Sequence, residues 1–245
     1  MIYKYYSNEN EYAIENFRNG QICFSHVNQF NDNLEFEITS QEKNCEEIFS
    51  EIVKQQIEEM KFKLRVACFC KRADLENMWG YYANKGSGFC LGYDEKELQI
   101  CVPDLIINEV SYSDKVPIPI DKIDAKDMII AQTCHKRKCW QEEQEIRALA
   151  FLTEDFFFIQ KLMLNSKGAW KPLVGGIIAC ELPVYLNNRI PNGPCIYYSP
   201  KNVSITLNPK ELIIGRMCEK EYEKELREIA TDKKITVRKY GVSNA

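Results

Sequence analysis

Strand-like segments alternate irregularly with helical ones along this chain, and that order limits the possible folds more than any other feature. Alternating or short apolar runs predict strands over residues 2–6, 21–26, 63–71, 89–93, 105–112, 176–182, 212–217 and 235–240. A period near 3.6 predicts helices over residues 10–20, 41–62, 74–86, 125–138 and 219–234. Because strands and helices do not alternate one for one, we expect an α+β fold with a mixed or largely antiparallel sheet flanked by helices.

Residues that favour helix ends support two of these assignments. Asn8 or Asn10 is placed to cap the first helix and Gly20 to end it, because Asn accepts hydrogen bonds from free backbone N–H groups and Gly adopts the left-handed conformation. Asp74 is placed in the same way before the short third helix. We therefore expect these helices to begin and end at these positions.

The chain is expected to form one domain over residues 1–245. Its length suits one elaborated domain better than two, and 45% of its residues are apolar, enough to fill a substantial core. No internal repeat, low-complexity linker or break in composition marks a boundary. No G-x-G-x-x-G or Walker A sequence is present, so neither nucleotide-binding fingerprint supports a Rossmann or P-loop fold.

Charge and cysteine content indicate a cytoplasmic protein. The 32 Lys and Arg residues are outnumbered by 36 Asp and Glu residues, so the chain lacks the bulk positive charge of a dedicated nucleic-acid binder. Its eleven cysteines follow no apolar signal segment, which predicts reduced, buried thiols. No apolar stretch approaches the roughly 20 residues that span a membrane. No metal is expected, although the spacing of Cys134, His135 and Cys139 leaves that question open.

The densest group of site-like residues is the run Trp140, Glu143, Glu145 and Arg147. In a helix, Glu143 and Arg147 would form an ordinary surface pair worth about 0.3–0.5 kcal/mol. In a strand over residues 143–151, Glu143, Glu145 and Arg147 would share one face. The apolar residues 148–152 favour the strand, while composition alone leaves a site and a solvated surface equally open.

A strand would give these residues a chemical use. Two carboxylates about 7 Å apart could stabilise a cationic, oxocarbenium-like sugar, and Arg147 could hold them ionised or bind a phosphate. The basic residues 136–138 just before this run read either as a solvated helix end or as a phosphate contact beside a cleft.

Four segments in a fixed order resemble a bacterial family known as domain of unknown function 2971, which is associated with phage defence and abortive infection. They are Tyr3-Lys4-Tyr5; Phe24-Ser25 to Phe30-Asn31-Asp32; Cys68-Phe69-Cys70 with Met78-Trp79, Tyr82-Ala83 and Gly88; and Trp140, Glu143, Glu145 and Arg147. The chain departs from the family at Asn33, where a proline is usual, at Tyr81, where a histidine is common, and at Cys70, where a serine is common.

The family's layout is similar to that of ADP-ribosyltransferases, which implies NAD as a co-substrate. The resemblance implies that Lys4 or Tyr5 contacts the nucleotide, that Tyr82 stacks on a ring, and that Glu143 or Glu145 is the catalytic carboxylate. It also suggests ligand contacts from Ser25, Asn31, Asp32 and Trp79. From the residues alone, Asn31 and Asp32 read as a turn, and the i, i+3 spacing of Trp79 and Tyr82 reads as core packing.

Three functions follow as hypotheses. The leading one is a defence-associated effector or toxin that transfers ADP-ribose from NAD, or cleaves NAD, with a protein or nucleic-acid acceptor. In it Glu143 and Glu145 stabilise the ribosyl cation and Arg147 orients them or binds phosphate. The first rival is a non-catalytic nucleotide sensor or partner-binding protein. The second is a metal-dependent nuclease that uses Glu143, Glu145 and Asp32 around a divalent cation.

Overall fold

A ten-stranded sheet forms the centre of the computed structural model, which describes residues 1–30, 56, 59–102, 104–114, 125–152, 177–180 and 202–241. Its strands, in chain order, are β1 (Ile2–Tyr6), β2 (Gln21–His26), β3 (Leu64–Cys70), β4 (Phe89–Tyr93), β5 (Ile106–Glu109), β8 (Glu145–Phe151), β9 (Ile177–Cys180), β10 (Asn202–Thr206), β11 (Glu211–Ile214) and β12 (Thr236–Lys239). Apart from the parallel pair β11–β12, the pairs in this sheet are antiparallel. The expected α+β class with a mixed, mostly antiparallel sheet is confirmed.

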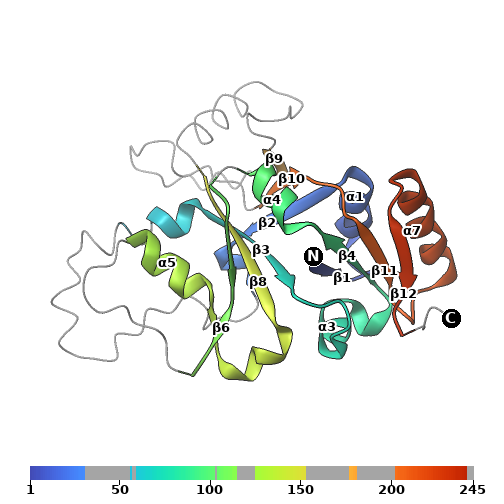
Figure 1. Cartoon of the computed structure of the whole chain (residues 1–245), viewed down its shortest axis with the longest axis horizontal. Coiled ribbons are helices and arrows are strands. Elements are labelled where there is room, and N and C mark those ends of the chain that lie inside the picture. Colours follow the sequence, from blue (N-terminus) through green and yellow to red (C-terminus); the bar gives the residue numbers. More distant parts are fainter. Residues whose placement is uncertain are drawn as a thin grey trace, which may run out of the picture.

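Helices lie on both faces of the sheet (Figure 1). They are α1 (Glu11–Asn19), α3 (Glu76–Tyr81), α4 (Glu95–Cys101), α5 (Ala125–Thr133) and α7 (Lys220–Asp232), with short 3-10 helices η1 (Val27–Gln29), η2 (Asn84–Gly86) and η3 (Lys138–Glu143). A small parallel sheet joins β6 (Ser111–Tyr112) to β7 (His135–Lys136). Helices α1 and α7 lie side by side, and an ion pair between Arg18 and Glu225 connects them.

Most predicted elements are confirmed, and one capping prediction is wrong. The Asn10 side chain accepts from the Tyr12 N–H at the start of α1, and Gly20 ends that helix in the left-handed conformation. Asp74, in contrast, does not cap α3, because its carboxylate is held by the Arg72 guanidinium at 2.8 and 2.7 Å.

Some boundaries differ from those expected. The predicted helix over 125–138 ends at Thr133, since the next carbonyl, that of Cys134, accepts from the Ser111 N–H in the small sheet. The predicted strand over 105–112 divides at Val110, whose N–H donates to the Glu145 carbonyl. Helix α4 and strand β10 were not predicted, and most of the helix expected over 41–62 lies outside the described residues.

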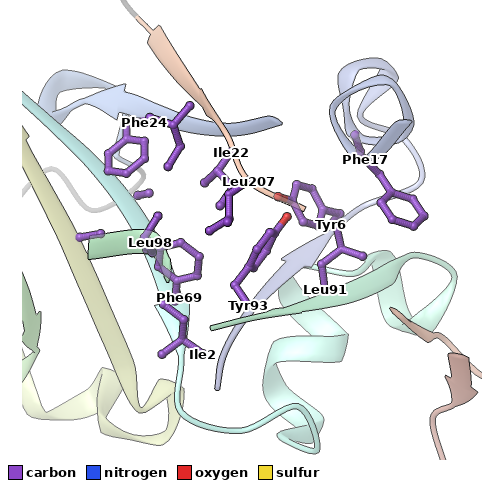
Figure 2. Close-up of a cluster of buried hydrophobic side chains, with 14 of the residues drawn as sticks. Ile2, Tyr6, Phe17, Ile22, Phe24, Phe69, Leu91, Tyr93, Leu98 and Leu207 are labelled. Atoms are coloured by element: carbon purple, nitrogen blue, oxygen red, sulfur yellow. The ribbon is translucent and has the colours of Figure 1, made fainter. Parts of the chain in front are cut away.

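Aromatic and aliphatic side chains from β1, β3 and β4 form the main core. Figure 2 shows these side chains converging around Tyr6 and Tyr93. The Tyr6 ring stacks on Phe89 at 5.0 Å between ring centroids, and Phe17 of α1 packs on Phe89 at 5.9 Å. Leu98 and Leu226 extend this core to α4 and α7.

A fork in the sheet positions the candidate site. Strand β8 pairs with β3 along the whole of Leu64–Cys70 and so occupies one edge of β3. Strands β1 and β2 share the other edge: β1 meets β3 at Cys70, and β2 meets it at Arg65 and Val66. The backbone of β3 around Cys68 therefore lies where β1 and β2 diverge, and the Lys4 Nζ donates to the Cys68 carbonyl at 3.1 Å.

Candidate functional site

A pocket of about 210 Å³ opens beside this fork. Its walls come from β1, η1, β3, α3, β7, η3 and β8. Aromatic and apolar side chains make up most of the lining: Tyr3, Tyr5, Phe30, Cys68, Phe69, Cys70, Met78, Tyr82 and Trp140. The charged lining residues are Lys4, Lys136, Glu143, Glu145 and Arg147. Five charges in an aromatic-walled pocket are costly unless they pair with one another or with a ligand.

Strand β8 presents Glu145 and Arg147 on the face that also carries Cys70 and Cys68, their opposite neighbours on β3. The Arg147 guanidinium holds the Glu145 carboxylate with two hydrogen bonds, Nε to Oε1 at 2.8 Å and Nη2 to Oε2 at 3.1 Å. It also donates from Nη1 to the Thr133 carbonyl. This two-point contact fixes both side chains in one orientation.

Glu143 reaches the same pocket from a different element, so its predicted place on the strand is wrong. It is the last residue of η3, and Gln144 reverses the chain in the left-handed conformation (φ 46°, ψ 49°) before β8 begins at Glu145. The Tyr82 hydroxyl donates to Oε1 of Glu143 at 2.7 Å. The Lys136 ammonium donates to Oε2 at 2.6 Å. The turn thus brings Glu143 beside Glu145 without strand alternation.

Lys136 joins the two glutamates and was not among the predicted site residues. Its Nζ lies 2.8 Å from Oε2 of Glu145 as well as 2.6 Å from Glu143, and 5.6 Å from the centre of the Trp140 ring. Its side chain is only 8% exposed. The sequence signal for Lys136 was charge balance: two buried glutamates beside one arginine call for a second cation.

Burial excludes the surface-pair interpretation of this run. Glu143, Glu145 and Arg147 are 2%, 5% and 1% exposed. A solvated helical pair would leave its side chains in water, whereas these are enclosed and hydrogen-bonded. The charged run is therefore an internal ionic network that lines a pocket.

The network holds Glu145 ionised. Burial alone would raise the pKa of Glu145, but the charge and hydrogen bonds of Arg147, together with the Lys136 ammonium, lower that pKa to about 2. Burial and the neighbouring Glu143 raise the pKa of Tyr82 far above its ordinary value. At neutral pH Tyr82 is therefore a neutral donor to Glu143.

The other predicted ligand contacts divide into three groups. Lys4 and Tyr5 line the pocket, as Tyr82 does. Trp79 does not line it: its indole donates to the Ala73 carbonyl at 2.8 Å and its ring stacks on Tyr240, so Trp79 belongs to the core. Ser25 lines a neighbouring groove.

Asn31 and Asp32 lie outside the described residues, so neither their expected ligand contacts nor their expected turn has a counterpart in the structure.

Cys134, His135 and Cys139 differ in burial and in partners. Cys134 is buried, Cys139 is exposed, and the His135 Nε2 lies 3.2 Å from the Ser113 hydroxyl. Within the described residues, no three His, Cys, Asp or Glu side chains gather as metal ligands would. None of the described helices is both long and apolar enough to cross a membrane.

Comparison with known proteins supports a family resemblance over part of the chain and gives no function. Residues 78–148 match the family model described as "Protein of unknown function (DUF2971)", which supports the family resemblance drawn from the sequence. The matched segment contains Tyr82, Lys136, Glu143, Glu145 and Arg147, the five residues of the hydrogen-bonded network. No curated protein and no solved structure matches the chain.

Proposed function

We propose that this pocket cleaves the bond between nicotinamide and ribose in NAD, and passes the ADP-ribosyl group to water or to an acceptor. The observation that carries the proposal is the buried Glu143 carboxylate, held at a pocket wall by the Tyr82 hydroxyl and the Lys136 ammonium. The order of the first elements, β1 with Lys4 and Tyr5 and then α1 and β2, is the order expected of ADP-ribosyltransferases and supports the proposal. The expected catalytic glutamate lies on a later strand, whereas Glu143 lies on η3, just before β8.

The chemistry requires a fixed negative charge. As the glycosidic bond breaks, its electron pair leaves with neutral nicotinamide and positive charge develops on the ribose. A nucleophile then adds to the anomeric carbon and loses its proton. A carboxylate already oriented in a site shielded from water stabilises that charge as it forms.

Glu143 is better placed than Glu145 to face the ribose. Both oxygens of Glu145 are occupied by the Arg147 guanidinium, and Lys136 adds a third contact. Glu143 receives one hydrogen bond from a neutral hydroxyl and one from the shared ammonium. We therefore assign Glu143 the catalytic role, and Glu145 and Arg147 the role of positioning Lys136.

The two cations also make the pocket acceptable to an anionic nucleotide. Lys136 and Arg147 balance the charges of Glu143 and Glu145, so a phosphate does not meet uncompensated carboxylates. The further idea that this activity serves antiviral defence, as an effector or toxin, rests on the family resemblance and not on the pocket.

Release of nicotinamide from NAD tests the proposal. The purified full-length chain is incubated with NAD, alone and with protein or nucleic-acid acceptors, and nicotinamide is measured by chromatography. We expect release by the wild type and a loss of at least a hundredfold in Glu143→Gln. Glu142→Gln is the matched control, because Glu142 is the exposed neighbour on η3 and should leave the rate unchanged. No release under any of these conditions would overturn the proposal.

A binding-only role is the second candidate, and the saturation of Glu145 favours it. Arg147 and Lys136 together make three contacts with the Glu145 carboxylate, as expected of a network that shapes the pocket and takes no part in a reaction. Tight NAD binding without nicotinamide release would select this function.

The nuclease hypothesis fits the geometry less well. A divalent cation held by Glu143 and Glu145 would have to lie between their carboxylates, where the Lys136 ammonium lies. Asp32, the third ligand of that hypothesis, is outside the described residues. Magnesium-dependent cutting of DNA or RNA by the wild type, lost in Glu143→Gln, would restore it.

A further inference from the structure

A second cavity adjoins the pocket on the other side of the fork. It is a groove of about 480 Å³ between β1, α1, β2 and the end of α3. Lys4, Tyr5 and Tyr82 line both cavities. The groove adds residues that the pocket does not have, among them Ser7, Tyr12, Asn16, Ser25 and Tyr81. The two cavities are therefore neighbours that share one wall.

The pocket is small for the ligand proposed above. Its volume of about 210 Å³ lies below the roughly 300–1,000 Å³ of sites that enclose a drug-sized molecule. It can take one ring and its sugar, so the other half of a dinucleotide must lie outside it. The groove is the larger of the two cavities and begins at the shared wall.

Lys4 lies at the junction. Its Nζ donates to the Cys68 carbonyl and lies 5.5 Å from the centre of the Phe69 ring, both of which belong to the pocket. The same atom lies 5.9 Å from the centre of the Tyr6 ring, which belongs to the groove. Among the described residues Lys4 has no carboxylate partner, whereas Lys136 and Arg147 pair with the glutamates. Two of its three N–H donors remain for an anion at this point.

The groove itself suits an uncharged aromatic group with polar edges. Lys4 is the one charged residue among the described residues that line it. Tyr81 exposes 73% of its surface, so its ring is accessible for stacking, and Tyr12, which is 48% exposed, lines the same groove. Ser7 and Ser25 add hydroxyl groups. These are the features that recognise a nucleoside, since bases stack on tyrosine rings and present hydrogen-bonding edges.

We infer that the pocket and the groove together form a two-part site for a dinucleotide whose central diphosphate lies against Lys4. One nucleoside lies in the pocket beside Glu143, and the other lies in the groove against Tyr81 and Tyr12. This inference rests on the proposed function in two respects only: that the dinucleotide is NAD, and that its cleaved end lies in the pocket.

Binding of NAD and of its two halves tests the inference. Isothermal titration calorimetry with Glu143→Gln, which prevents turnover, compares NAD, nicotinamide mononucleotide and AMP; wild type with AMP checks that this substitution leaves the groove intact. We expect NAD to bind at least tenfold more tightly than either half. Lys4→Met should weaken binding of all three at least fivefold, because each carries a phosphate.

A groove variant separates the two halves. Tyr81→Ala, alone and combined with Tyr12→Ala, should weaken binding of NAD and AMP at least fivefold and leave nicotinamide mononucleotide unchanged. Ile100→Ala is the control, because Ile100 is 80% exposed on α4 and lines neither cavity. Equal affinities for NAD and nicotinamide mononucleotide, an unchanged affinity for AMP in the groove variant, or no binding of any of the three would overturn the inference.

Failure of the inference is distinguishable from failure of the proposed function. Nicotinamide release that is lost in Glu143→Gln but unaffected by Tyr81→Ala and Lys4→Met refutes the two-part site alone. The expected pattern of affinities without nicotinamide release supports the two-part site and refutes cleavage.

Discussion

The Lys136 ammonium and the Glu143 carboxylate are 2.6 Å apart, and both side chains are almost fully buried. Neither could be enclosed alone, because an isolated charge in an apolar surrounding costs several kcal/mol. The same ammonium also contacts Glu145, which Arg147 holds from the other side. Four charges thus depend on one another, and removing any one leaves the other three with an unbalanced buried charge.

Arg147→Met should destabilise the chain by about 3 kcal/mol, because it leaves Glu145 with Lys136 as its remaining cation partner. Arg216→Met is the control, since the Arg216–Glu76 bridge is solvated, with side chains 56% and 74% exposed, and should cost about 0–1 kcal/mol. Urea unfolding followed by fluorescence measures both. Equal, small effects for the two variants would show that the buried network contributes nothing to stability.

The network should make stability depend on pH below neutrality. Arg147 and Lys136 depress the pKa of Glu145 to about 2 in the folded chain, against 4.5 for an ordinary glutamate. The folded chain therefore releases this proton more readily than the unfolded chain. The resulting stability is fully present above pH 4.5 and is lost as the pH falls toward 2.

The size of this contribution is about 3 kcal/mol. The free energy of unfolding of the wild type and of Glu145→Gln, measured from pH 6 to pH 2.5, isolates it. The wild type should lose more stability than the variant over this range, since Gln does not titrate. Parallel curves would contradict the assigned pKa.

Tyr82→Phe should impair the proposed reaction without removing the pocket wall. The change deletes the hydroxyl that donates to Glu143 at 2.7 Å and leaves the ring in place. We expect a loss of about 1–2 kcal/mol in stability and about a tenfold loss in the rate of nicotinamide release. Tyr222→Phe is the matched control: the Tyr222 hydroxyl is buried without a hydrogen-bond partner among the described residues and the residue lines neither cavity, so this change should lower neither quantity.

Replacing Gly88 or Gly80 by alanine should change the free energy of unfolding in opposite directions. A Cβ at Gly88 would lie 2.0 Å from the Tyr6 carbonyl oxygen, so Gly88→Ala must displace the β1 backbone and should cost about 3 kcal/mol. A Cβ at Gly80 meets nothing within 4 Å, and Gly80 lies in α3. Gly80→Ala should therefore raise the free energy of unfolding by about 0.5–1 kcal/mol. Thermal unfolding of the two variants gives the comparison.

The elements that the sequence predicts well are those with strong local signals. Asn10 and Gly20 define α1 because each supplies a hydrogen bond or a backbone conformation that a helix end needs. Strands β1 and β4 follow from short apolar runs next to polar or glycine-rich segments. Helix α4 carries an equally local signal, because the Asp94 side chain accepts from the N–H groups of Lys96 and Glu97.

The site was predicted only in part, because its assembly depends on a turn and on long-range contacts. Strand alternation places Glu145 and Arg147 on one face, as the structure has them. It cannot predict that Gln144 adopts a left-handed conformation, which moves Glu143 off the strand and still leaves it in the pocket. The sequence left residues 136–138 as either a solvated helix end or a phosphate contact, and only the early end of α5 makes Lys136 internal.

The Arg147 side chain donates to the Thr133 carbonyl, and this hydrogen bond closes the chain from Thr133 to Arg147 into a loop. The two residues are 14 positions apart, and Lys136 crosses the same loop to Glu143 and Glu145. A loop tied in this way opens as one cooperative unit, so its amide hydrogens should exchange with solvent together. The Lys136 contacts are ion pairs, so acid and not a reducing agent weakens them. Protonating one of these carboxylates would therefore both leave the network with a net positive charge and loosen the segment that forms the pocket wall.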